Sequence, residues 1–127
     1  MTANEVREAL RQKIELRWSE YKAGVLQCSA LEIFDHAEEI ATAKFCHDRL
    51  TVDISGYEED CLEYLLRFVD PLAVVRDQRL AVHEFDCLDI DDEFGQTLWM
   101  IQNTQDAEQE YALDPDWMPQ QGGPSMC

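Results

Sequence analysis

The C-terminal part of this sequence has no positively charged side chain. All ten lysine and arginine residues lie at or before Arg79, and 11 of the 27 aspartate and glutamate residues follow it. The net charge of −17 therefore divides into −6 for residues 1–79 (10 bases, 16 acids) and −11 for the last 48 residues. Nucleic-acid binders need basic surfaces that displace counterions from phosphate, so this charge excludes a conventional one and disfavours an anionic membrane surface.

Long apolar runs and paired cysteines are also missing. No apolar run approaches the roughly 18 residues of a membrane span. The first ten residues include Glu5, Arg7 and Glu8, whereas a signal peptide has a basic and then an apolar stretch. The five cysteines are an odd number without paired spacing, which is typical of reduced thiols. We therefore expect a cytoplasmic protein.

The length and composition are those of one globular domain. A chain of 127 residues with 46% hydrophobic and 29% charged residues can bury one modest core. Three prolines and two glycines follow Leu113, with little aliphatic content. We expect a single helical domain over residues 1–113 and a flexible tail over residues 114–127.

Apolar periodicity predicts an all-α fold, a compact bundle of four to five helices. The first helix is expected over residues 4–22, ending at Gly24. A Ser29–Glu32 capping pattern starts a second helix over residues 30–48. The apolar stripe of this second helix comprises Leu31, Ile33, Phe34, Ala37, Ile40, Ala41 and Phe45.

The remaining helices follow a connector near residues 50–54. A second capping pattern, Ser55–Glu58, predicts a third helix that ends at Asp70. Asp70 then caps a fourth helix that begins at Pro71 and ends near residue 84. A fifth helix is expected from about residue 91 to 111, with a short strand over residues 97–101 as the alternative.

The sequence contains no complete metal or catalytic motif. Asp89–Glu93 resembles the start of a calcium loop, but Phe94 replaces the required glycine and Met100 the bidentate glutamate. Cys46, His47, His83 and Cys87 could supply zinc ligands, but adjacent residues such as Cys46 and His47 point in different directions. We therefore predict no catalytic residue, no metal site and no cofactor; a metal-dependent enzyme is the least favoured reading.

The densest acidic run places six carboxylates in ten residues: Glu84, Asp86, Asp89, Asp91, Asp92 and Glu93. In a helix these charges would recur about every 2.5 Å, given a rise of about 1.5 Å per residue. Duplex DNA carries one charge per about 1.7 Å, so such a surface can compete with nucleic acid for a basic groove. Trp99 and Trp117 are candidate aromatic anchors beside it, although for Trp99 a place in the core is the favoured interpretation. The alternative is a solvated connection that keeps the protein soluble.

Two short segments, Leu31–Ala37 and Pro71–Val75, resemble a family of small bacterial proteins known as domain of unknown function 3848. The likeness covers roughly residues 5–80, with similar residues at Leu10, Lys13 and Tyr21. It implies a compact helical protein of gut bacteria, often encoded among mobile-element genes, and brings no functional residues. The sequence departs from the family after about residue 84, and a mobile-element setting would favour a counter-defence or regulatory role.

These observations predict a non-catalytic acidic binding protein. The first hypothesis is a nucleic-acid-mimicking inhibitor of a basic, nucleic-acid-handling defence protein, such as a CRISPR or restriction protein. Its partner would be that protein's basic surface, with no direct contact to nucleic acid or membrane. The alternative is a helical adaptor or regulator that binds a partner through an apolar groove.

Overall fold

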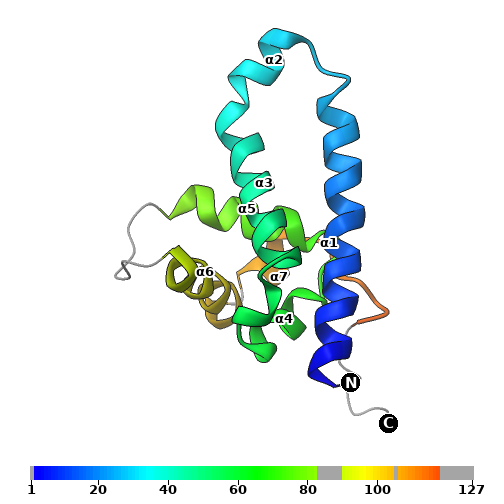
Figure 1. The fold of residues 1–127 in the computed structure, drawn as a ribbon, viewed down its shortest axis with the longest axis vertical. Helices are drawn as coiled ribbons and strands as arrows, with labels where there is room; N and C mark the ends of the chain where they lie inside the picture. Colours follow the sequence, from blue (N-terminus) through cyan, green and yellow to red (C-terminus); the bar gives the residue numbers. More distant parts are fainter. Residues whose placement is uncertain (1, 83–89, 105, 118–127) are drawn as a thin grey trace.

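The computed structural model describes residues 2–82, 90–104 and 106–117, with the side chains of residues 90–92 excepted. The protein is all-α, and within these ranges the only β-type pairing is an isolated bridge between Phe68 and Leu113. The helices, in chain order (Figure 1), are α1 (Ala3–Val25), α2 (Ala30–Asp35), α3 (Ala37–Thr51), the 3-10 helix η1 (Ile54–Gly56), α4 (Glu59–Leu65), α5 (Pro71–Ala81), α6 (Ile90–Thr104) and α7 (Ala107–Glu110).

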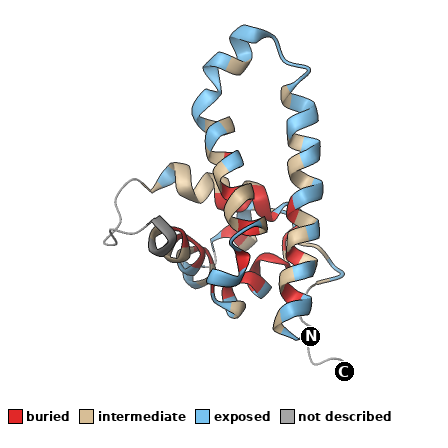
Figure 2. Ribbon diagram, viewed as in Figure 1, coloured by how far each residue is buried: buried red, intermediate tan, exposed pale blue. Residues whose placement is uncertain are grey.

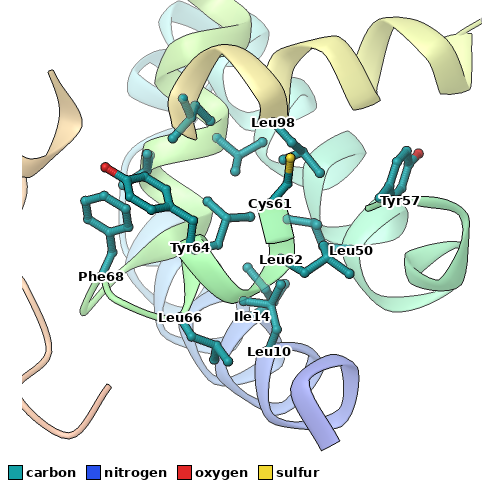
Figure 3. Packing of buried hydrophobic residues seen from close by; sticks show 14 of the residues in the cluster. Leu10, Ile14, Leu50, Tyr57, Cys61, Leu62, Tyr64, Leu66, Phe68 and Leu98 are labelled. Atoms are coloured by element: carbon teal, nitrogen blue, oxygen red, sulfur yellow. The ribbon is translucent and has the colours of Figure 1, made fainter. Parts of the chain in front are cut away.

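The core lies at one end of the long helix pair α1 and α3. Helix α1 contributes Val6, Leu10 and Ile14, which recur every four residues on one face. The other core residues come mainly from α3 to α6, and the core side of the fold is red in Figure 2. Leu10 and Ile14 lie beside Leu50 of α3 and Leu62 of α4 in the close-up of Figure 3.

The segment after α7 returns to the body of the protein. The amide of Asp114 donates to the carbonyl of Arg67 at 2.7 Å, and that of Val69 donates to the carbonyl of Ala112 at 3.0 Å. The Asp114 carboxylate also pairs with the Lys13 ammonium of α1 at 2.7 Å. Residues 114–117, which the sequence assigns to the tail, therefore contact the helical domain.

Two predicted helix starts are confirmed by their capping bonds. At α2 the Ser29 hydroxyl accepts from the Glu32 amide at 3.2 Å, and the Glu32 carboxylate accepts from the Ser29 amide at 2.9 Å. At α5 the Asp70 carboxylate accepts from the Ala73 amide at 3.1 Å, with Pro71 in the first turn. These bonds satisfy amides that have no partner within the helix.

Other boundaries differ from the prediction. The first helix continues through Gly24 to Val25 because a lone glycine lowers helix stability without stopping the helix. The predicted helix over residues 30–48 is two helices, since His36 leaves the helical region (φ −106°, ψ 19°). The predicted Ser55–Glu58 cap is wrong: Glu58 itself is the N-cap of α4, without a side-chain capping bond. The structure also resolves residues 97–101 as helix, so the alternative strand is wrong.

Candidate functional site

The predicted acidic surface is only partly described. Glu84, Asp86 and Asp89 lie outside the described residues. Asp91 and Asp92 lie in the first turn of α6, and Glu93, which follows them, is half-buried. Whether the six carboxylates form one surface therefore stays a prediction, and the site is built from their described neighbours.

Trp99 lies on the surface, so the favoured interpretation of Trp99 as a core residue is wrong. Its side chain is 54% exposed, whereas Leu98 and Ile101 of the same helix are almost fully buried. Successive helical residues are rotated by about 100°, so burial of Leu98 and Ile101 turns Trp99 toward solvent. The apolar face of α6 was predictable, but not which of its edges would remain uncovered.

Two hollows lie beside Trp99, and both are also lined by Glu58. One has a volume of about 320 Å³ and lies toward Tyr57 and Gly95. The other has a volume of about 450 Å³ and is lined by Asp60, Arg67 and Gln102 among others. Glu63 lines an adjoining hollow together with Asp60 and Gln102. We call Glu58, Asp60, Glu63, Trp99 and Gln102 the Trp99 surface; it combines one exposed aromatic ring with three carboxylates.

The only basic residue lining these hollows, Arg67, stacks on an aromatic ring. Its guanidinium carbon lies 4.9 Å from the centre of the Tyr64 ring. Burial, with Glu108 nearby, raises the pKa of Tyr64 to about 12, so its phenol is neutral at physiological pH. Arg67 keeps its positive charge, so Glu58, Asp60, Glu63 and Arg67 together carry a net charge of −2.

Polar contacts between α4 and α6 fix the position of Trp99. The Cys61 thiol donates to Oε1 of Gln102 at 3.2 Å, and Nε2 of Gln102 donates to the Asp60 carbonyl at 3.5 Å. Leu98 and Ile101 pack into the same cluster as Cys61 and Leu62. Trp99 is thus held on a packed helix, so a partner would not have to order it.

Trp117, the second predicted anchor, lies elsewhere. Its half-buried ring packs against the core cluster, and its amide donates to the Asp114 carbonyl at 3.1 Å. It lines neither hollow beside Trp99. The structure therefore does not bring the two predicted tryptophans together on one binding surface.

A second surface, which sequence reasoning missed, lies where α1, α2 and α3 extend beyond the core. None of the 28 residues from Glu15 to Thr42 is buried, and this end of the molecule is tan and pale blue in Figure 2. A groove of about 360 Å³ is lined there by Tyr21, Val25, Ile33 and Ile40, with Glu20, Glu32, His36 and Glu39 among its polar residues. We call this the tip groove.

The residues around the tip groove correct the predicted apolar stripe of residues 30–48. Leu31 and Phe34 are 69% and 78% exposed, and Leu26 just before α2 is 74% exposed. The helical period was right, but no other described element covers this end of α2. Periodicity places these residues on one face of a helix, but it does not show whether another element covers that face. Exposed hydrophobic residues so close together are typical of an interaction site.

The candidate metal ligands have structural roles in the described part of the chain. Cys46 is fully buried, and desolvation raises the pKa of its thiol to about 12. The imidazole of His47 contacts the carboxylates of Glu15 and Asp48 and stacks on Trp18, with ring centres 5.1 Å apart. His83 and Cys87 lie outside the described residues, and among the others no group of three or more His, Cys, Asp or Glu is placed to hold a metal ion.

None of the helices in the described ranges is long and apolar enough to cross a bilayer. Comparison of the chain with protein-family models, curated proteins and solved structures found no match in any of the three. The family resemblance at residues 5–80 therefore stays an expectation.

Proposed function

We propose that this protein is a non-catalytic inhibitor that occupies the basic, nucleic-acid-binding surface of a defence-type protein, with Trp99 as its anchor. The observation that carries the proposal is the exposure of Trp99 on a helix without a basic residue, beside hollows that the carboxylates of Glu58 and Asp60 also line. Tryptophan is enriched among the residues that dominate protein interfaces, and 54% of this side chain is available for contact.

The charge around Trp99 supports a basic partner. Glu58, Asp60 and Glu63 lie on α4 or directly before it, and the first turn of α6 contains three consecutive acids after Ile90. The backbone of Asp92 lies on the same side of α6 as Trp99, because seven residues make about two helical turns. These carboxylates would attract the basic groove of a partner over long range, and the groove would then contact the indole ring of Trp99.

A competition assay tests this function. Purified defence nucleases, such as a guide-loaded Cas9 and restriction enzymes, are bound to a labelled DNA duplex, and the protein is titrated in while DNA release is followed by anisotropy. We expect release from at least one enzyme, with an apparent affinity that falls about tenfold between about 50 and about 300 mM salt as charges are screened.

Two variants connect that release to the Trp99 surface. Trp99→Ala should weaken inhibition about 30-fold, the effect of losing roughly 2 kcal/mol at an interface anchor. Leu16→Ala is a matched control, because Leu16 is also 54% exposed and lies on α1. Inhibition that resists both Trp99→Ala and neutralisation of Glu58, Asp60 and Glu63, or no DNA release from any enzyme, would contradict the proposal.

The adaptor hypothesis is favoured by a different observation, the tip groove. A protein that binds only through an apolar groove should show weak salt dependence in the same assay. Its activity in this assay should also be unchanged by Trp99→Ala. The two functions use separate surfaces and are therefore separable by these variants.

A further inference from the structure

We propose that the tip groove is a second docking site, and that its occupant is a basic amphipathic segment of a partner protein that inserts an apolar side chain between α1 and α3. This inference goes beyond inhibition through the Trp99 surface. The groove is lined by residues of α1, α2 and α3, and Figure 1 shows α2 at one end of the molecule and α6 toward the other. Neither surface depends on the other.

Helices α1 and α3 extend further than the core requires. The last buried residue of α1 is Ile14, and the helix continues for another 11 residues to Val25. At about 1.5 Å per residue, this extension is about 16 Å long. In α3, which runs back toward the core, Ala43 is the first buried residue. Two helices thus project from the core with an open groove between them.

This projection exposes apolar side chains. Six large apolar side chains are exposed in the described residues, and Leu26, Leu31 and Phe34 are three of them. They lie within nine residues of one another in the sequence and do not line the tip groove itself, whose apolar lining includes Val25, Ile33 and Ile40 from the same end of the molecule. Clustered apolar exposure at one end of a small protein is typical of an interaction site.

The charge of this projection selects the occupant. Residues 20–42 contain the five acids Glu20, Glu32, Asp35, Glu38 and Glu39 but a single base, Lys22. Arg17 pairs with Glu20 and Arg76 with Glu39 from outside this range, so the acids outnumber the bases at this end by five to three. A second copy of this chain would bring like charges together, which is unfavourable at an interface. A segment with lysine or arginine beside an apolar residue complements both the carboxylates and the groove.

The size of the groove defines the mode of binding. A volume of about 360 Å³ is at the lower end of the range of about 300–1,000 Å³ for ligand pockets. It accommodates a few side chains, as when an amphipathic helix lays its apolar anchors into a groove. Lysine and arginine on the flanks of such a helix would lie near Glu20, Glu32 and Glu39.

The test uses a defined probe, a peptide of about 16 residues made of leucine and lysine, with leucine at helical positions i, i+3, i+4 and i+7. Binding to the full chain is followed by amide chemical shifts and by anisotropy. We expect the largest shifts at Val25, Ile33 and Ile40 and little change at the Trp99 indole. Peptides with serine for leucine, or glutamate for lysine, should bind at least tenfold more weakly.

Double variants in the groove, each matched to a variant elsewhere on the protein, provide the control for the peptide-binding experiment. Ile33→Ser with Ile40→Ser should weaken binding at least tenfold, whereas Leu16→Ser with Val52→Ser should leave it unchanged. Neutralising Glu20, Glu32 and Glu39 to glutamine should weaken binding further than the same treatment of Glu58, Asp60 and Glu63. Glutamine at position 32 preserves the capping box, so α2 should remain folded.

Three results would overturn the inference. One is an equal loss of peptide affinity in the groove pair (Ile33→Ser with Ile40→Ser) and in the control pair (Leu16→Ser with Val52→Ser). Another is binding that disappears in Trp99→Ala and persists in the groove pair, which would place the peptide on the Trp99 surface. The third is a dimer of the protein alone that Phe34→Ser dissociates, because the occupant would then be a second copy. None of these affects the DNA-release assay, so the proposed function is tested separately.

Discussion

Asp114 provides a sharp test of how the C-terminal segment is held. The sequence places this residue in a flexible tail, but its carboxylate lies 2.7 Å from the Lys13 ammonium, which also donates to the Leu66 carbonyl at 3.0 Å. The two side chains are 21% and 10% exposed. Asp114→Asn removes the charge while keeping the shape, so it isolates this ion pair.

The expected loss of unfolding free energy in Asp114→Asn lies between two reference values. Exposed ion pairs contribute up to about 1 kcal/mol, and hydrogen bonds to charged groups about 1.5–3 kcal/mol. For a half-buried pair we expect Asp114→Asn to lower the free energy of unfolding by about 1–2 kcal/mol at pH 7. For a chain of this length, the melting temperature should fall by roughly 4–10 °C.

The pH dependence gives an independent readout. The hydrogen bond from Lys13 holds the pKa of Asp114 below its ordinary value of 3.8 in the folded protein. A carboxylate with a lowered folded pKa stabilises the protein above its unfolded pKa and loses this effect as the pH falls through the folded value. The difference between wild type and Asp114→Asn should therefore be constant above about pH 5 and shrink below about pH 4.

Thermal and urea denaturation at several pH values measure this difference. Asp116→Asn is the control, because its exposed carboxylate has the same charge two residues away. A melting temperature for Asp114→Asn equal to that of the wild type at pH 7 would refute the argument. So would a difference that stays the same down to about pH 2.

Three further predictions concern the core, the tip and the thiols. Leu50→Ala should lower the free energy of unfolding by about 3 kcal/mol in urea, because Leu50 is fully buried, whereas exposed Val52→Ala should change it by less than about 0.5 kcal/mol. Ser29→Ala removes a capping bond worth about 1 kcal/mol from α2, and should speed amide hydrogen exchange there without changing global stability. Alkylation of the folded protein at pH 8, followed by peptide mass mapping, should label exposed Cys28 at least tenfold faster than Cys46, whose burial raises the pKa of its thiol to about 12; equal rates would contradict the described core.

Local chemistry explains what was predictable from the sequence. Ser29 with Glu32, and Asp70 with Pro71, specify helix starts through bonds within four residues, and both starts are present. Val6, Leu10 and Ile14 likewise recur at helical spacing, and all three are buried on one face of α1. In each case the deciding interaction is short-range or follows from helical geometry alone.

Tertiary contacts explain what was not predictable. Leu31 and Phe34 have the spacing of a core face, but no described element packs over them, so they remain exposed. Trp99 is exposed because Leu98 and Ile101 take the buried side of α6. Whether an apolar residue is covered depends on where the other helices pack, and single-helix patterns do not contain that information.

The measurement that tests the account most directly is the Trp99→Ala variant in the DNA-release assay, with Leu16→Ala beside it. The account predicts that the wild-type protein and Leu16→Ala release DNA from a defence nuclease with equal potency at low salt. Trp99→Ala should need about 30 times more protein while melting as a folded domain. Equal potency of Trp99→Ala and the wild type would contradict the claim that this surface binds the partner.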